Sequence, residues 1–144
     1  MSARMATAKK PSKVTPFDFV GRWELVPGES KYDLQQPPKS ASLELKEEAG
    51  GMFIRLEWVD HVGAKGEIDH SFRFKKPVMV NGVDHTLTLN DDGALETVSE
   101  KDGAEVSRTV RTLSPDGKRM ELVQSGKAGA KTYKNLSVYQ RVAR

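Results

Sequence analysis

The sequence predicts an all-β protein, an antiparallel up-and-down β-barrel of about eight to ten strands with a flexible N-terminal tail. Three observations support this prediction. Apolar and polar residues alternate with a period of two along most of the chain, as in strands with one buried face. Turn dipeptides such as Asn81-Gly82 and Asp102-Gly103 separate these segments at short intervals. No segment shows a competing helical period.

The first predicted strand, Phe19 to Leu25, has the most specific pattern in the chain. Its odd-numbered residues are apolar or glycine and share one face, whereas Arg22 and Glu24 lie on the other. Gly21 permits close backbone approach, and Trp23 supplies a large apolar side chain with one N–H to satisfy. We therefore expect Gly21 and Trp23 at the closed end of a barrel.

The segment from Pro27 to Lys39 contains four residues that oppose a long helix, namely Pro27, Gly28, Pro37 and Pro38. We expect an Ω-type loop that crosses the barrel mouth and is held by Tyr32 and Leu34. Loops of this kind are often functional.

Two predicted hairpins follow this loop. Ser40 to Glu48 turns at Gly50-Gly51 into a strand with a clear apolar face, and the turn from Gly63 to Gly66 leads into a third strand. The residues that we expect to face inward are Ala41, Leu43, Leu45, Met52, Ile54, Leu56, Trp58, Ile68, His70, Phe72 and Phe74.

The remaining strands are separated by tight turns. Pro77 breaks the preceding strand, and Asn81-Gly82 joins a short Val78 to Val80 segment to one with His85, Leu87 and Leu89 inward. Up-and-down order with tight turns favours a barrel over a two-sheet sandwich, because closure removes the sheet edges. The later strands are Ala94 to Lys101, Ala104 to Leu113, Lys118 to Ser125 and Thr132 to Val142.

The run Phe19-Val20-Gly21-x-Trp23-x-Leu25 resembles the first strand of lipocalins and cellular fatty-acid-binding proteins, which share the calycin barrel. The longer run Gly21-x-Trp23-x-Leu25-x-Pro27-x-x-Ser30-Lys31-Tyr32 is similar to uncharacterised bacterial lipocalin-like proteins. A count of about ten strands suits the fatty-acid-binding barrel better than the lipocalin one. That family has a two-helix lid between its first two strands, which this sequence lacks.

The C-terminal part resembles the last three strands of fatty-acid-binding proteins, through Val110-Arg111-Thr112-Leu113, Asp116-Gly117-Lys118 and Ser137-Val138-Tyr139-Gln140-Arg141. In that family two arginines and a tyrosine hold the ligand carboxylate. Arg111 matches the first arginine and Tyr139 the tyrosine, but Ser137 stands at the second arginine. The resemblance therefore implies a barrel ligand, with one of the two cationic anchors for a fatty acid missing.

The resemblance also implies a role for Arg141. In lipocalins a basic residue of the last strand packs over the tryptophan of the first strand. Arg141 is expected to contact Trp23 in the same way, a cation–π interaction of about 1 kcal/mol that closes the barrel.

Arg111 shares its predicted face with Ser107 and Thr109. A guanidinium in a partly enclosed cavity stays charged, so it meets either an internal acid or an anionic ligand. The alternative is that Arg111 points outward or pairs with Glu96 or Glu121. Tyr139 could equally contact a ligand or pack in the core.

We predict that the barrel binds a small hydrophobic or amphipathic molecule, including an anionic one, without a cofactor. An enzyme on the same scaffold is the alternative, an isomerase or hydratase with His70 or His85 as base and Arg111 polarising a carbonyl. A barrel filled by its own side chains is a further alternative. No metal site is predicted, because no acid lies at ligand spacing from the histidines. The predicted ligand-binding residues are Arg111, Tyr139, His85, His70, Trp58, Phe72, Phe74 and Leu87.

The 144 residues predict a basic tail at 1–16, disordered, and one lipocalin-like barrel at 17–144. Four basic tail residues account for the net charge of +3, so the barrel is nearly neutral and no specific nucleic-acid partner is expected. Salt-sensitive binding of nucleic acid or membranes through the tail is the alternative.

The lack of cysteine excludes disulfides and thiolate metal sites. We expect a cytoplasmic monomer or weak dimer that does not insert into membranes.

Overall fold

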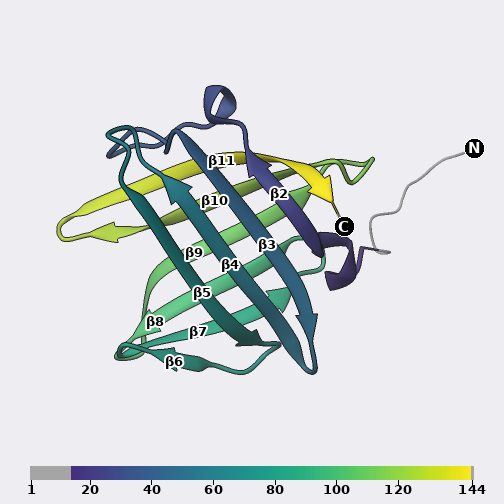
Figure 1. Cartoon of the computed structure of the whole chain (residues 1–144). Helices are drawn as coiled ribbons and strands as arrows, with labels where there is room; N and C mark the ends of the chain where they lie inside the picture. Colours follow the sequence, from purple (N-terminus) through teal and green to yellow (C-terminus); the bar gives the residue numbers. More distant parts are fainter. Residues whose placement is uncertain (1–13, 144) are drawn as a thin grey trace, which may run out of the picture.

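The alternating segments form ten antiparallel strands in the computed structural model, which describes residues 14–143 (Figure 1). This confirms the predicted all-β, up-and-down barrel, including the short strand after Pro77. Two 3-10 helices, η2 (Pro16–Phe19) and η3 (Pro27–Glu29), flank the first strand. The strands are β2 (Gly21–Leu25), β3 (Ser40–Glu48), β4 (Gly51–Val59), β5 (Lys65–Arg73), β6 (Val78–Val80), β7 (Val83–Leu89), β8 (Leu95–Lys101), β9 (Ala104–Leu113), β10 (Arg119–Ala128) and β11 (Lys131–Ala143).

The sheet has the order β5-β4-β3-β2-β11-β10-β9-β8-β7-β6, so the first and last strands of the chain are neighbours. In Figure 1, β2 to β5 cross in front of β7 to β11, and the curled sheet forms a nearly closed barrel. The two ends of the sheet meet along a seam between β5 and β7. There Phe74 bridges to Leu87, and the backbone N–H of Lys75 donates to the Leu87 carbonyl at 2.9 Å.

The tight turns explain why particular dipeptides occur between the strands. Asn81 and Gly82 have φ values of 52° and 81°, and Asp102 and Gly103 have 53° and 81°. Two consecutive residues with positive φ make a turn whose twist matches that of the flanking strands. Asparagine, aspartate and glycine adopt this conformation most readily, so these dipeptides set the hairpin register.

The closed end of the barrel is built around Trp23. Its side chain is fully buried, and its indole N–H donates to the Phe19 carbonyl at 3.1 Å, so the polar group of a buried indole is satisfied. Phe19, from η2, is fully buried beside it. The other fully buried large side chains of the described chain are Leu45, Met52, Leu87, Leu95 and Met120.

Arg141 fastens the last strand to this closed end. Its guanidinium carbon lies 4.2 Å from the centroid of the Trp23 ring, which is the contact expected from the sequence. The same guanidinium donates hydrogen bonds to the backbone carbonyls of Asp18, Val20 and Gly117. These bonds tie η2, the start of β2 and the turn after β9 to β11, so Arg141 has a structural role.

The N-terminal tail predicted for residues 1–16 lies largely outside the described residues, which begin at position 14. Val14 packs against the core and Pro16 starts η2, so ordered structure begins before residue 17. Within residues 14–143 there is no helix of the length and apolar character needed to cross a membrane.

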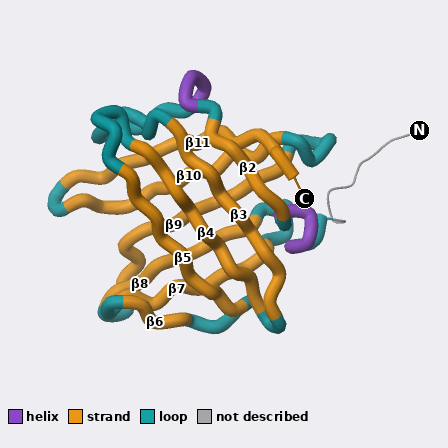
Figure 2. The backbone as a smooth tube through the Cα atoms, in the orientation of Figure 1, coloured by secondary structure: helices purple, strands orange, loops and turns teal. Residues whose placement is uncertain are grey.

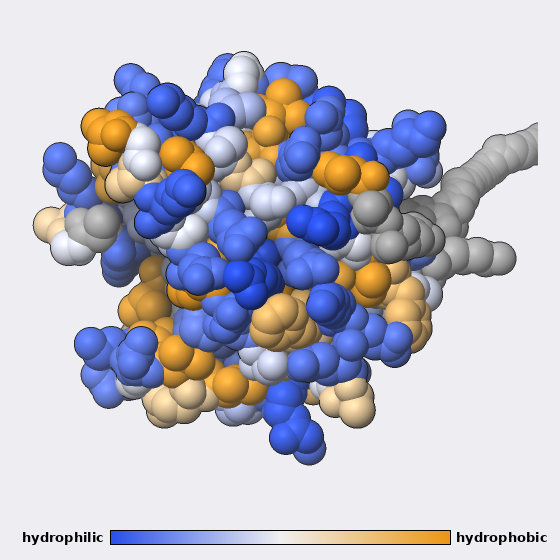
Figure 3. Space-filling model, viewed as in Figure 1, coloured by the Kyte–Doolittle hydropathy of each residue, from blue (hydrophilic) through white to orange (hydrophobic). Residues whose placement is uncertain are grey.

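The wall and the ends of the barrel differ in character. Figure 2 shows that strands form the wall, whereas loops and 3-10 helices gather at the ends. The face seen in Figure 3 is largely hydrophilic, with apolar residues in small groups between the polar ones. On this outer surface Arg55 pairs with Glu57 at 2.9 Å and with Glu67 at 2.6 Å. Exposed pairs of this kind contribute little to stability, because solvent screens the attraction.

Candidate functional site

The inner surface of the barrel has two unlike walls. Residues that are directly paired across an antiparallel ladder share a face, so the strand registers assign each side chain to the inside or the outside. The inner face of β2 to β5 is mainly apolar: Trp23, Leu25, Ala41, Leu43, Leu45, Met52, Ile54, Leu56, Trp58, Ile68, His70 and Phe72. The inner face of β8 to β11 carries many polar groups: Thr97, Ser99, Ser107, Thr109, Arg111, Gln124, Ser137 and Tyr139.

The apolar wall keeps accessible surface toward the end of the barrel that faces away from Trp23. Ile68 lies opposite Leu56 on this wall, yet 47% of its surface is exposed. Leu56 and Trp58 are half-buried. Side chains packed solidly against one another would not retain this surface, so the inner wall is open here.

Trp58 contributes to an open depression of about 760 Å³ at this end. Inward-facing Leu25 and Ala41 line it as well, and the indole of Trp58 lies against Gly66, where a Cβ atom would come within 2.3 Å of the ring. Arg111 and the histidines do not line the depression. The remaining lining residues have outward parity in the strand registers, so most of the depression lies on the outer face of β2 to β5: Glu24, Ser40, Ser42, Arg55, Glu57, Val59, Lys65 and Glu67.

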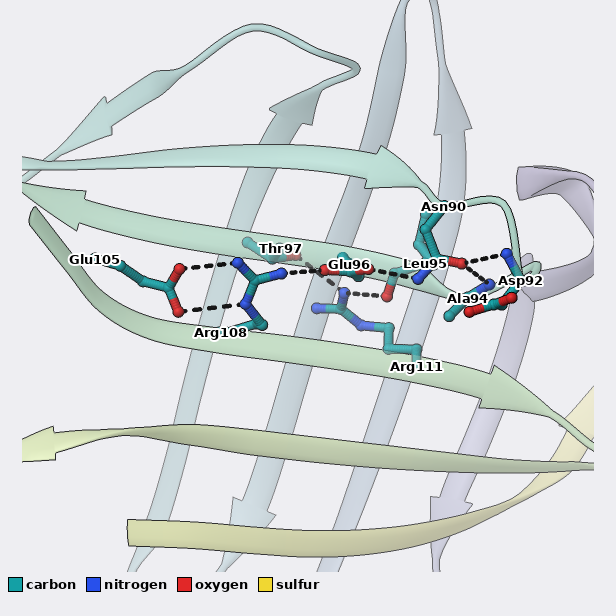
Figure 4. A network of polar contacts seen from close by, with 9 residues as sticks. All are labelled: Asn90, Asp92, Ala94, Leu95, Glu96, Thr97, Glu105, Arg108 and Arg111. Carbon is teal, nitrogen blue, oxygen red and sulfur yellow. Dashed lines mark hydrogen bonds and ion pairs between the residues drawn. The ribbon is translucent and has the colours of Figure 1, made fainter. Parts of the chain in front are cut away.

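Arg111 is the principal charged group of the polar wall. Only 6% of its surface is exposed, and its Nη1 donates to the Thr97 hydroxyl at 3.0 Å and to the Leu95 carbonyl at 3.4 Å (Figure 4). Its Nε is buried without a hydrogen-bond partner, and within residues 14–143 no carboxylate forms an ion pair with it. Burial lowers the pKa of Arg111 to about 10. The alternative that Arg111 points outward or pairs with Glu96 or Glu121 is therefore wrong.

Arg108, three residues earlier on β9, shows the contrasting environment. It pairs with Glu105 at 2.9 Å and with Glu96 at 2.5 Å, and its side chain is 41% exposed (Figure 4). The hydrogen bonds that Arg108 donates to Glu105 raise the pKa of Arg108, with a further contribution from Glu96. One strand thus carries a fully paired arginine outside the barrel and an arginine without a carboxylate inside it.

Tyr139 faces the same interior from β11 and is 3% exposed. Burial raises the pKa of its phenol, the nearby Tyr32 adds to the shift, and Arg111 opposes it. Tyr139 therefore stays protonated and can donate a hydrogen bond. Ser137, at the position where fatty-acid-binding proteins have a second arginine, shares a hydrogen bond of 2.7 Å with the Tyr32 hydroxyl.

Tyr32 is a site residue that the sequence analysis treated only as a loop anchor. Its neighbour Lys31 forms an antiparallel bridge with Leu136 of β11. Beyond the end of β2, this part of the loop therefore continues the pairing with β11. Alternation then turns Tyr32 toward the interior, where it reaches Ser137. The predicted anchoring by Leu34 is wrong, because half of its surface is exposed.

The two predicted histidines lie together at the seam of the barrel. Their rings are stacked with centroids 6.0 Å apart. The ring of Phe72 packs edge-to-face against both, with its centroid 5.7 Å from that of His70 and 5.9 Å from that of His85. His85 Nδ1 shares a hydrogen bond of 2.7 Å with the buried Ser99 hydroxyl. The cluster therefore closes the gap between β5 and β7. In the described chain no group of three or more histidine, cysteine, aspartate or glutamate side chains could hold a metal ion.

The enzymatic alternative requires a histidine and Arg111 to reach one point. Arg111 hydrogen-bonds at Thr97, whereas His85 hydrogen-bonds at Ser99, one step further along the inner face of β8. Among the described residues no hydrogen bond joins Arg111 to His70 or His85.

The remaining predicted ligand contacts differ in burial. Leu87 has no exposed surface and Phe72 has 8%, so both pack in the core of the barrel. Phe74 is partly buried and lies beside Pro16 and Phe17 at the closed end. Trp58, in contrast, lines the open depression.

Protonation of His85 is expected to destabilise the protein. Burial lowers the pKa of His85, the facing His70 adds to the shift, and Asp84 opposes it. The unfolded chain then binds this proton more readily than the folded one, so stability is full above about pH 6.5 and falls as the pH drops through the folded pKa. Urea unfolding at about pH 7.5 and about pH 5.5 measures the loss, which His85→Gln should reduce.

The matched control for this experiment is His61→Gln, at an exposed turn position. Its loss of stability on acidification should equal that of the wild type. A His85→Gln protein that loses as much stability as the wild type would show that His85 is not the responsible group.

Three comparisons place this geometry among known proteins. No family model matches the sequence, and no curated protein matches it. Among solved structures, the fold is similar to a Schistosoma mansoni fatty acid binding protein in complex with arachidonic acid (TM-score 0.59, 14% identity, 87% of this chain and 96% of that chain). It is also similar to secretory abundant heat soluble protein 4 from Ramazzottius varieornatus (TM-score 0.60, 16% identity, 91% of this chain and 99% of that chain). The chain forms a calycin-type barrel.

At identities of 14% and 16%, these similarities concern the fold alone. They agree with the fold that the first-strand and C-terminal motifs implied. The similarity to bacterial lipocalin-like proteins and the cytoplasmic location stay predictions. The function of this calycin-type barrel must therefore be inferred from the residues of its own inner surface.

Proposed function

We propose that the barrel binds a small amphipathic molecule that carries one anionic group. The anionic group lies at Arg111, and the apolar part lies along the inner wall of β3 to β5. The observation that supports this proposal is the buried guanidinium of Arg111, which has a free Nε and no carboxylate partner in the described structure.

A buried charge without a counter-charge is costly, by several kcal/mol after relaxation of the protein and penetration of water. Thr97 and the Leu95 carbonyl satisfy only Nη1, and neither is charged. A carboxylate would accept the Nε–H and neutralise the guanidinium in one planar, bidentate contact. Tyr139 remains protonated beside it and could donate to the same anion.

The apolar part of the ligand has a surface to contact. Leu56, Trp58 and Ile68 retain accessible area on the wall opposite the polar strands. Burial of apolar surface contributes roughly 25 cal/mol per Å² before the costs of binding are counted. The similar fatty acid binding protein was solved with arachidonic acid, an amphipathic carboxylate, which supports a ligand of this class.

Three ligands with the same ten-carbon chain test the role of charge: decanoate, decanol and decylamine. Isothermal titration should detect decanoate binding, with decanol weaker by about 10-fold or more and decylamine weaker still. Decanol binding as tightly as decanoate would show that Arg111 does not select the head group. The absence of binding by all three would refute the proposal.

A further inference from the structure

We infer that the preferred ligand is a hydroxylated carboxylic acid rather than a plain fatty acid, with its hydroxyl group about five carbons from the carboxylate. This inference rests on the proposed function and names its substrate class. It follows from a row of polar side chains beside Arg111, the inner strip of Ser107, Thr109 and Gln124.

The strand registers place the inner strip on the same face as Arg111. Thr109 pairs with Thr97, which hydrogen-bonds to Arg111, and with Gln124 on β10. Ser107 is one further step along β9 on this face. The strip therefore extends from the guanidinium along the inside of the barrel toward the end where Trp58 lies.

The inner strip has unused hydrogen-bonding groups. In the described structure, no hydrogen bond engages the side chains of Ser107, Thr109 or Gln124, and all three residues are half-buried. By comparison, Ser99 on the same wall already pairs with His85, and Thr97 with Arg111. These three adjacent side chains have donors and acceptors without a protein partner. Binding of a plain alkyl chain beside them is disfavoured, because the chain would displace their water without replacing its hydrogen bonds.

The spacing along the strip sets the position of the hydroxyl. Residues two apart on a strand are separated by roughly 6.7 Å, at about 3.3 Å per residue. Nη1 of Arg111 lies at the level of Thr97 and Thr109, and we place the carboxylate beside it, on Nε, so Ser107 lies about one such step away. An extended carbon chain spans this distance with about five carbons.

Binding of decanoate, 5-hydroxydecanoate and 10-hydroxydecanoate to the full-length protein tests the inference. We expect 5-hydroxydecanoate to bind about 3- to 10-fold more tightly than decanoate, as one or two net hydrogen bonds would give. The terminal hydroxyl of 10-hydroxydecanoate should give no such gain. Equal or weaker binding of 5-hydroxydecanoate, or an equal gain from 10-hydroxydecanoate, would overturn the inference and leave the proposed function intact.

Variants of the inner strip identify the residues responsible. Ser107→Ala with Thr109→Val removes two hydroxyls and should abolish the preference for 5-hydroxydecanoate over decanoate. Thr112→Val, at an exposed outward position of the same strand, is the matched control and should keep the preference. If the double variant does not fold by circular dichroism, Ser107→Ala alone should reduce the preference.

The outcomes separate the two claims. A preference that survives in the strip variants refutes the inner strip as its source. If no carboxylate binds to the wild type, both this inference and the proposed function fail. If decanoate binds and requires Arg111 but no hydroxylated acid binds better, only the present inference fails.

Discussion

Replacing Trp23 with alanine is expected to lower the free energy of unfolding by about 3–5 kcal/mol, the usual cost of truncating a buried aromatic residue. The indole is fully buried, donates a hydrogen bond to Phe19 and lies under the guanidinium of Arg141. All of these contacts are lost together, at the closed end where the first and last strands meet. Chemical denaturation followed by circular dichroism measures the loss.

The matched control is Trp58→Ala, which removes the other tryptophan of the chain. Trp58 is half-buried on the inner wall, so its truncation should cost clearly less stability and should affect ligand binding instead. A Trp23→Ala protein no less stable than Trp58→Ala would contradict the closed-end role of Trp23.

Replacing Arg111 with methionine is expected to have opposite effects on stability and on binding. The ligand-free protein should become more stable by about 1–3 kcal/mol, because an apolar side chain of similar length replaces a buried guanidinium that lacks a counter-charge. The affinity for decanoate should fall by about 10- to 100-fold, the value of a charge-assisted hydrogen bond. Denaturation and isothermal titration measure the two effects on the same samples.

Arg108→Met provides the matched control on the same strand. Its guanidinium pairs with Glu96 and Glu105 on the outside, so the variant should lose up to about 1 kcal/mol of stability and keep its affinity for decanoate. If Arg111→Met destabilises the protein and leaves the affinity unchanged, Arg111 has a structural role and the proposed site is wrong.

Local rules were sufficient to predict the strands and their turns. The two-residue alternation from Ala41 to Phe74 and dipeptides such as Asn81-Gly82 depend only on neighbouring residues. The contact of Arg141 with Trp23 came from a family resemblance, because these residues are far apart in the sequence. Burial followed the alternation less closely, since Ile68 shares the inward parity but lies where the wall is open.

The environment of Arg111 could not be predicted from its own strand. The alternation along β9 predicted that Arg111 faces inward. Whether a carboxylate would pair with it depended on the register of β8, which turns Thr97 inward and Glu96 toward Arg108. Tyr32 was missed for a similar reason. Its inward orientation depends on a loop that continues beside β11, and no short-range pattern encodes that pairing.

The most direct test of the account is the Nε–H resonance of Arg111 in the nitrogen-15 NMR spectrum, assigned by its loss in Arg111→Met. In the free protein this N–H is buried and has no partner, so its signal should resemble that of a guanidinium without a hydrogen bond. Addition of decanoate should shift it strongly downfield, as expected for an N–H that gains a carboxylate acceptor. A resonance that stays unchanged while decanoate binds would show that the anion lies elsewhere and would contradict the central claim.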